Sequence, residues 1–275
     1  MDYSKLGRIK LSRKAVSRIM LILLVVSTLT FTLNIRSVYA AAQVNILTHS
    51  GWLDSVGYYH VSGEVENVGD TPTSFVKVTA TFYDSGDTVV ATSFTYAMLD
   101  VLLPGRKSPF EVLLVDTTQA AKVHRYSLGV TFSATSPIPI GLEILSNSSY
   151  IDGAGYMHVV GEIKNIETGT ATSVKIMATF YNSTGNVVAT AFTYSDPSDI
   201  DPGQTAPFEV LLIYTNRVPL VATYALTAES NQYAMVSEFP SILIQSLLMF
   251  LTFFAIFVIE MHVKYKTVKS GGEHE

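Results

Sequence analysis

The stretch VKVTATFY at residues 76–83 decides the fold class, because apolar and polar residues alternate along it. Its apolar members fall on one face of a β-strand and its polar members on the other, which is the pattern of a strand with one buried face. Residues 84–87, DSGD, supply turn chemistry, and residues 88–96 return as a second strand. The stretch therefore predicts an antiparallel hairpin with Val76 and Phe82 pointing into a core.

The hairpin belongs to an internal repeat with a period of 98 residues. Residues 57–114 align without a gap with residues 155–212, and half of the aligned positions are identical. The segments GEVEN at 63–67 and GEIKN at 161–165 illustrate the match, and PFEVLL occurs in both copies. Because the period has the size of a domain, it predicts a tandem duplication rather than a solenoid.

Each copy contains about seven short segments rich in β-branched and aromatic residues, separated by turn signals. In the first copy, further strands are expected at residues 43–48, 58–66, 109–115 and 123–132. No segment between residues 41 and 230 has a helical period. The sequence therefore predicts an all-β fold of two tandem immunoglobulin-like β-sandwich domains.

The repeat also sets the domain boundaries. We place the first sandwich at residues 41–135 and the second at residues 141–230. The linker between them, residues 136–140, contains Pro137 and Pro139, which favour a semi-rigid extended chain.

Three motifs of the first copy resemble the FxLYD domain. They are GEVENVG at 63–69, VKVTATFYD at 76–84, and residues 103–111, which begin with LPG and end with PFE. The second copy repeats them as GEIKN, ATFYN and DPGQTAPFE. The resemblance covers residues 43–131 and 141–229, which is most of both repeats.

The match departs from the family pattern in the second copy, where Asn182 stands in the place of the Asp. The resemblance implies small extracytoplasmic β-sandwiches of prokaryotic surface proteins and lipoproteins. It implies no known activity and brings no catalytic residues.

The amino-terminal residues 1–40 have the composition of a secretory signal peptide. Six Lys and Arg residues lie within the first eighteen positions, and an apolar run follows at residues 19–33. Small residues at Val38 and Ala40 predict cleavage after Ala40. The alternative is an uncleaved membrane anchor, although fifteen apolar residues are short for a complete span.

Residues 241–259 predict a transmembrane helix, because they form nineteen consecutive positions without a charge. Three Lys residues follow within residues 260–275, which places this tail in the cytoplasm. Residues 231–240 are then a juxtamembrane segment. Because both ends carry basic flanks, residues 41–238 are expected outside the cell whether or not the signal is removed.

Charge and cysteine content exclude several classes of function. Residues 41–238 hold eight Lys and Arg against nineteen Asp and Glu, so the body is acidic and a nucleic-acid partner is not expected. The chain has no Cys, which excludes disulfides, thiolate metal sites and Cys nucleophiles. Stability must therefore come from packed sandwich cores.

His60 and His158 occupy the same position of the two repeats, and each is expected to share a strand face with a Tyr and with Glu64 or Glu162. A metal site would need such ligands to converge, but the two His residues belong to different domains. We interpret them as members of a polar strand face, with no metal bound.

The loop at residues 196–201, DPSDID, is the densest acidic segment of the chain. Asp196, Asp199 and Asp201 could offer oxygen ligands to Ca²⁺. The loop lacks the Gly and the distant Glu of an EF-hand, so a solvated turn is the preferred interpretation.

No catalytic motif is recognisable in the sequence. The repeats share the acids Asp54 and Glu111 with their equivalents Asp152 and Glu209, and such acids usually lie on rims or turns. Nucleophile elbows, zinc-protease helices and phosphate loops are absent from the sequence. We therefore predict neither catalytic residues nor a cofactor.

Two glycosylation sequons are present, NSS at Asn147 and NST at Asn182. Asn182 is expected in a hairpin turn, and Asn147 after the first strand of the second domain. Both are therefore candidates for surface glycosylation.

These observations predict a non-enzymatic, single-pass membrane protein that presents two β-sandwich domains at the cell surface. Its expected partners are the membrane and an unknown extracellular protein or glycan. The alternative is an accessory subunit of a membrane transport or secretion complex, with the transmembrane helix as the contact element. Polar residues within the predicted span, such as Gln245, favour this alternative.

Overall fold

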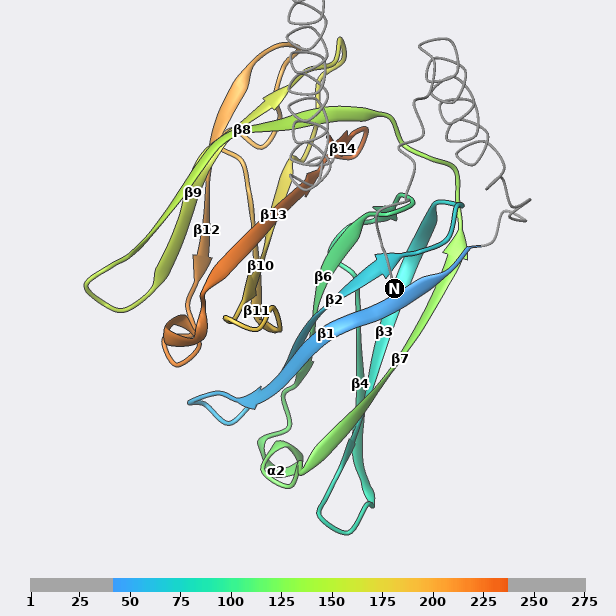
Figure 1. The fold of residues 1–275 in the computed structure, drawn as a ribbon, viewed down its shortest axis with the longest axis vertical. Helices are drawn as coiled ribbons and strands as arrows, with labels where there is room; N and C mark the ends of the chain where they lie inside the picture. Colours follow the sequence, from blue (N-terminus) through green and yellow to red (C-terminus); the bar gives the residue numbers. More distant parts are fainter. Residues whose placement is uncertain (1–41, 237–275) are drawn as a thin grey trace, which may run out of the picture. The chain divides into compact units, whose positions relative to one another are not determined.

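The structure is a computed structural model that describes residues 42–236. Strands dominate these residues and form sheets that pack face to face, so the prediction of an all-β sandwich fold is confirmed (Figure 1). Across residues 42–236, no helix is long and apolar enough to cross a membrane. The predicted signal segment (1–40), membrane span (241–259) and tail (260–275) lie outside the described residues.

The first sandwich consists of two sheets joined by short turns. One sheet has the antiparallel order β1 (Val44–Leu53), β2 (Tyr59–Asn67) and β6 (Lys107–Leu114). In the other sheet, β3 (Thr73–Tyr83) pairs with β4 (Val89–Tyr96), β5 (Val101–Leu102) and β7 (Arg125–Ala134). A single helical turn, α2 (Thr117–Ala120), follows β6 and is capped by the side chain of Asp116.

The second sandwich repeats this arrangement, but its strands form one continuous sheet of seven strands. The half equivalent to β1-β2-β6 contains β8 (Ile140–Ile151), β9 (Met157–Asn165) and β12 (Thr205–Leu212). The other half contains β10 (Lys175–Tyr181), β11 (Val187–Tyr194) and β13 (Thr223–Glu229). The short strand β14 (Ala234–Met235) joins the halves, because it pairs with both β13 and β8. A 3-10 turn, η1 (Val218–Leu220), precedes β13.

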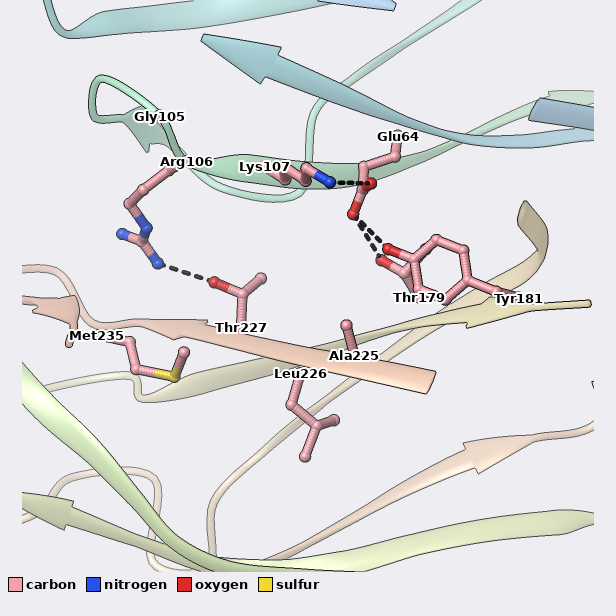
Figure 2. Close-up of a pocket in the computed structure, with 10 residues that line it drawn as sticks. All are labelled: Glu64, Gly105, Arg106, Lys107, Thr179, Tyr181, Ala225, Leu226, Thr227 and Met235. Carbon is pink, nitrogen blue, oxygen red and sulfur yellow. Dashed lines mark hydrogen bonds and ion pairs between the residues drawn. The ribbon is translucent and has the colours of Figure 1, made fainter. Parts of the chain in front are cut away.

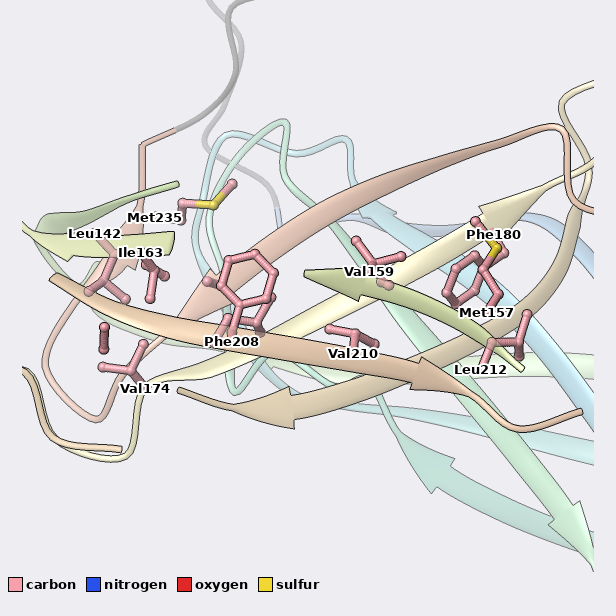
Figure 3. Packing of buried hydrophobic residues seen from close by; sticks show 14 of the residues in the cluster. Leu142, Met157, Val159, Ile163, Val174, Phe180, Phe208, Val210, Leu212 and Met235 are labelled. Atoms are coloured by element: carbon pink, nitrogen blue, oxygen red, sulfur yellow. The ribbon is translucent and has the colours of Figure 1, made fainter. Parts of the chain in front are cut away.

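The alternation at residues 76–83 places the core as expected. Val76, Val78, Ala80 and Phe82 are all buried, whereas the polar residues between them are partly exposed. In the second sandwich the equivalent residues Val174, Ile176, Ala178 and Phe180 belong to one buried cluster with Phe208 and Val210 of β12. Figure 3 shows Val174, Phe180, Phe208 and Val210 within this cluster. The predicted register of the hairpin is therefore confirmed in β3.

A buried Asn closes each GExxN motif. The side chain of Asn67 donates to the carbonyls of Thr71 (2.9 Å) and Leu102 (2.8 Å), and it accepts from the amide of Gly69 (3.0 Å). Asn165 makes the same three kinds of hydrogen bond in the second sandwich. This side chain holds β5, where no strand was expected, against the end of β2.

The outer face of β10 departs from the simple alternation. Met177 and Thr179 point away from the core of their own sandwich, yet both are buried. Met177 packs with the buried cluster of the first sandwich. The two sandwiches belong to the same compact unit of the chain and pack directly on one another. The expectation of one buried face per strand is therefore wrong for β10, because the neighbouring sandwich covers its second face.

Candidate functional site

A buried imidazole joins two carboxylates on the outer face of the β1-β2-β6 sheet. Nδ1 of His60 lies 2.8 Å from Oε1 of Glu111, and Nε2 lies 3.1 Å from Oδ2 of Asp54. We call this group the first clamp. Because each ring nitrogen faces a carboxylate, the imidazole satisfies both contacts as a donor only when it is protonated.

The second sandwich carries an equivalent second clamp. Nδ1 of His158 lies 2.7 Å from Oε1 of Glu209, and Nε2 lies 3.2 Å from Oδ2 of Asp152. The pairing is the same, but His158 is partly exposed, whereas His60 is buried. The duplicated geometry indicates a device that the fold uses in both copies.

The Asp of each clamp also shapes the turn between the first two strands of its sandwich. Oδ1 of Asp54 accepts the amides of Val56 (3.0 Å) and Tyr58 (2.8 Å). Gly57 lies inside this turn with a φ of 92°, a backbone conformation that residues other than Gly rarely adopt. Asp152 accepts the equivalent amides in the second copy. The clamp therefore connects a turn, β2 and β6.

An aromatic ring stacks on each imidazole. Trp52 lies parallel to His60 with ring centroids 4.2 Å apart, and Tyr150 lies parallel to His158 at 4.6 Å. Only the first clamp is closed by a residue of the other sandwich, since Tyr214 meets the rings of Trp52 (4.5 Å) and His60 (4.9 Å) edge-on. The first clamp is thus part of the contact between sandwiches.

The carboxylates determine the protonation of both clamps. Burial alone would lower the pKa of His60, but the hydrogen bonds and charges of Glu111 and Asp54 outweigh it, so the pKa is raised. For His158 the hydrogen bond with Glu209 is the largest cause, and it also raises the pKa. Both imidazoles are therefore held in the charged form more strongly than a free His.

This geometry limits the chemistry available to the clamps. To activate a nucleophile as a base, or to bind a metal ion, a His needs a ring nitrogen with a free lone pair. Both ring nitrogens of each clamp instead face a carboxylate. In the part of the chain that the structure describes, no group of three His, Asp or Glu side chains is arranged to hold a metal ion. The clamps fit best a role in fixing the strands and the turn.

A second polar cluster lies between the sandwiches. Tyr181 of β10 donates to Oε1 of Glu64 at 2.8 Å, and Nζ of Lys107 lies 3.8 Å from Oε2 of the same carboxylate (Figure 2). Burial raises the pKa of Glu64 despite these partners. Glu64 thus contacts the second sandwich, although it shares the face of β2 with His60.

Glu229 of β13 forms the other charged contact of this interface. Its Oε1 accepts the amide of Asp100 at 2.6 Å, while Arg106 donates to the hydroxyl of Thr227 (2.8 Å) and to the carbonyl of Ala228 (3.1 Å). Burial raises the pKa of Glu229 to about 7. A pocket of about 350 Å³ separates this contact from Glu64, and its lining comes from both sandwiches (Figure 2).

Two aromatic side chains stand exposed at the end of β4. Phe94 is 54% exposed and Tyr96 is 52% exposed, and their rings meet edge-on at 6.2 Å. The ammonium group of Lys77 lies 3.7 Å from the centroid of Phe94. We call these three residues the first aromatic patch. A pocket of about 590 Å³ opens beside it, lined in part by Tyr96 and Phe75.

The end of β11 carries a second aromatic patch at the equivalent positions. Phe192 is 52% exposed and Tyr194 is 49% exposed, with their rings edge-on at 6.3 Å. Lys175 lies above Phe192 at 5.3 Å. Contact with the first sandwich leaves these rings as exposed as their counterparts on β4. Core packing therefore does not explain the aromatic residues at these positions.

Comparisons with known proteins add no family. No family model matches the chain, and no curated protein is similar to it. Among solved structures it is similar to the exo-chitosanase CsxA of Amycolatopsis orientalis, with 13% identity and a TM-score of 0.26, over 70% of this chain and 26% of that one. It is also similar to red sea bream transglutaminase, with 8% identity and a TM-score of 0.23, over 72% of this chain and 30% of that one.

These similarities carry no argument about activity, because the TM-scores are low. The chain spans less than a third of the length of either matched protein.

Asp196, Asp199 and Asp201 of the acidic loop are exposed, whereas Ile200 between them is buried. Asp199 accepts the amide of Ser173 at 2.8 Å, and Asp201 accepts the hydroxyl of Thr170 at 3.0 Å. Asp196 precedes a cis peptide bond to Pro197. The calcium hypothesis for this loop stays a prediction.

The two sequon asparagines lie in different settings. Asn182 is half-buried in the turn between β10 and β11, where Oδ1 accepts the amides of Thr184 (3.0 Å) and Asn186 (2.9 Å). Asn147 is exposed, and its Oδ1 accepts the hydroxyl of Tyr224 at 2.8 Å. It lies within β8 rather than after it, because this strand continues to Ile151. Glycosylation stays a prediction for both.

The clamps were not found from the sequence, although their members were singled out. His60 was grouped with Glu64, whereas its partners Asp54 and Glu111 were assigned to turns and rims. A signal was present, since an Asp, a His and a Glu recur together with the period of 98 residues.

Proposed function

We propose that the chain is a non-enzymatic, membrane-anchored binding module outside the cell, whose two sandwiches present aromatic patches to another protein or a glycan. The predicted signal segment and the predicted span at residues 241–259 support this location. The resemblance to FxLYD domains and an immunoglobulin-like arrangement of strands also support it. In this proposal the carboxyl-terminal tail is cytoplasmic.

The observation that carries the proposal is the repeated exposure of the aromatic patches. Large aromatic rings stay half exposed at equivalent positions of both sandwiches. Their contact with water is unfavourable, and they add nothing to a core. Aromatic residues are enriched in the contact surfaces of proteins, and a neighbouring Lys adds a charged contact of its own. A contact surface accounts for the duplication of the rings together with their Lys.

The position of the patches in the sheets gives a partner access. β4 and β11 are edge strands of their sheets, so the aromatic rings lie at a sheet edge. Edge strands and their side chains are common sites for peptide or loop partners. A non-enzymatic role agrees with the clamps, whose imidazole nitrogens all face carboxylates.

The proposal is tested by removing the rings. The full chain with Phe94, Tyr96, Phe192 and Tyr194 all replaced by Ala should lose binding to glycan arrays and to proteins of the producing cell's surface. The control is Val56→Ala with Val115→Ala, which removes exposed apolar side chains outside the patches. Equal binding by the two variants would refute the proposal.

The alternative is an accessory subunit of a membrane transport or secretion complex. The polar residues within the predicted span, including Gln245, favour it. Purification in mild detergent separates the two proposals. A stoichiometric integral-membrane partner that persists without the aromatic rings would support the subunit role.

A further inference from the structure

The contact between the sandwiches is asymmetric. The first sandwich contributes the outer face of β1-β2-β6, which we call the front face, and the second contributes the outer face of β10-β11-β13, which we call the back face. Because the sandwiches are repeats, each has both faces. The chain thus retains a free back face on β3-β4-β7 and a free front face on β8-β9-β12 among its described residues.

The internal contact depends on a few polar groups. Glu64 of the front face accepts the hydroxyls of Tyr181 (2.8 Å) and Thr179 (3.5 Å) of the back face. At the other edge, the hydroxyl of Thr190 donates to the carbonyl of Phe110 at 3.5 Å. Packing of the two faces buries these polar groups away from water. The hydrogen bonds between the faces give them partners, and without those bonds their burial would be unfavourable.

The free faces carry the same groups at the same repeat positions. Glu162 of the free front face is the equivalent of Glu64, and it is exposed. Tyr83, Thr81 and Thr92 of the free back face are the equivalents of Tyr181, Thr179 and Thr190. Each residue is identical to its counterpart in the internal contact.

Apolar surface is also left open on the free front face. Trp52, which stacks on the first clamp, is only 7% exposed because the second sandwich covers it, whereas its equivalent Tyr150 is 50% exposed. Leu211 and Ile213 at the end of β12 are exposed too. The free front face thus has the same repeat positions and the same kinds of side chain as the front face of the first sandwich, which the second sandwich covers.

We propose that the free front face of one chain binds the free back face of a second copy, and so repeats between chains the contact made within each chain. Such a contact is heterologous, because different surfaces meet, and it leaves a free face at each end of the pair. It therefore leads to rows of chains rather than to closed dimers. The aromatic patches stay open in such a row, as the second patch does in the internal contact.

The contact between chains is weaker than the internal one. Thr79 replaces the buried Met177, so less apolar surface is removed from water. Gln204 and Thr131 replace Arg106 and Glu229, so the hydrogen bonds that these two charged side chains make across the internal contact are not repeated between chains. Association should therefore depend on concentration, as it would for copies confined to one membrane.

Single-cysteine variants test the proposal directly, because the chain has no Cys of its own. The full chain with Glu162→Cys and one affinity tag is mixed with the full chain carrying Tyr83→Cys and another tag. A bis-maleimide cross-linker should join the two in a mixed dimer. Each variant alone should give only background cross-linking.

Two matched pairs calibrate the result. Glu64→Cys with Tyr181→Cys in one chain should cross-link internally, which shows that the reagent spans this contact. Val56→Cys, at an exposed position of the first sandwich and thus outside the free front face, mixed with Tyr83→Cys should give the background from random collision. Thr81→Arg should abolish the mixed dimer by placing a long charged side chain in the contact.

A mixed dimer no stronger than the Val56→Cys background, with the internal pair cross-linking normally, would overturn the proposal. Efficient cross-linking of Glu162→Cys to itself would also overturn it, since that indicates a two-fold symmetric contact. Binding of proteins or glycans by the aromatic patches is measured with different variants. Failure of one proposal is thus distinguishable from failure of the other.

Discussion

Nδ1 of His60 lies 2.8 Å from Oε1 of Glu111 and links β2 to β6 through a buried, charge-assisted contact. The other ring nitrogen reaches Asp54, whose second oxygen holds the turn before β2. The protonated imidazole thus holds β2, β6 and the turn before β2 together. Trp52, the only Trp of the chain, stacks on this ring and offers a fluorescent probe of its surroundings.

Replacing His60 by Gln should flatten the pH dependence of stability above pH 6.5. The pKa of His60 is raised in the folded state above the ordinary value of 6.5. The stability that this adds is complete below pH 6.5 and is lost as the pH rises through the folded pKa. Urea unfolding between pH 5 and 9, followed by Trp52 fluorescence, should show a steeper loss for the unmodified chain than for His60→Gln.

The control for this measurement is His124→Gln, at an exposed His outside both clamps. It should follow the unmodified chain. Parallel curves for His60→Gln and the unmodified chain would contradict the interpretation of the clamp.

Replacing Glu229 by Gln should stabilise the chain at alkaline pH. The pKa of Glu229 is raised to about 7 from 4.5, so folding favours the neutral carboxyl. The free energy of unfolding therefore falls as the pH rises from 4.5 through 7. Gln keeps an oxygen for the amide of Asp100 without the charge. At pH 8 the variant should gain on the order of 2–3 kcal/mol, and at pH 4 it should match the unmodified chain.

Glu143→Gln is the matched control, because Glu143 is an exposed Glu of β8. Asp100 is left unchanged, because its charge contributes to the raised pKa of Glu229. A Glu229→Gln variant less stable than the unmodified chain at pH 8 would contradict this prediction. It would show that attraction between the Glu229 carboxylate and the charges of Arg106 and Lys175 exceeds the cost of burying that carboxylate.

Adding a methyl group at Gly63 should destabilise the first sandwich. A Cβ there would overlap the ring of Phe110 and would lie 2.8 Å from Cβ of His49. Such overpacking costs about 1–3 kcal/mol. Gly129→Ala is the control, because its Cβ would meet nothing within 4 Å. Equal urea midpoints for the two variants would mean that β2 can move away from β6 at little cost.

Local patterns predicted the strands because each signal lies within one short segment. The alternation at residues 76–83 was enough to assign the inward face of β3, and the repeat transferred the assignment to β10. β5 was missed because two residues carry no period, and its place depends on the side chain of Asn67. β14 was missed for the same reason, since it consists of Ala234 and Met235 alone.

Contacts between outward-facing polar residues could not be predicted in this way. Alternation shows that His60 and Glu64 share a face of β2, but not which strand or domain lies opposite each of them. Glu111 is 51 residues from His60, and Tyr181 is 117 residues from Glu64. The first pair depends on the order of strands in a sheet, and the second on the packing of two sandwiches.

Met177 and Thr79 provide the final prediction, because they occupy the same repeat position in different surroundings. Met177 is 0% exposed and packs with the core cluster of the first sandwich, whereas Thr79 is partly exposed on the free back face. Met177→Ala should therefore cost about 2–5 kcal/mol of unfolding free energy. Thr79→Ala should cost less than about 1 kcal/mol, as for most surface substitutions.

The same variants also show which contact is lost. Trp52 lies at the contact between the sandwiches beside Tyr214, so separation of the sandwiches should expose its ring to water before either core unfolds. Met177→Ala should bring this fluorescence change to lower urea concentrations than the loss of β-sheet circular dichroism, and Thr79→Ala should leave both unchanged. Equal losses from the two substitutions would mean that the sandwiches stand apart in solution, since only their contact distinguishes the two positions.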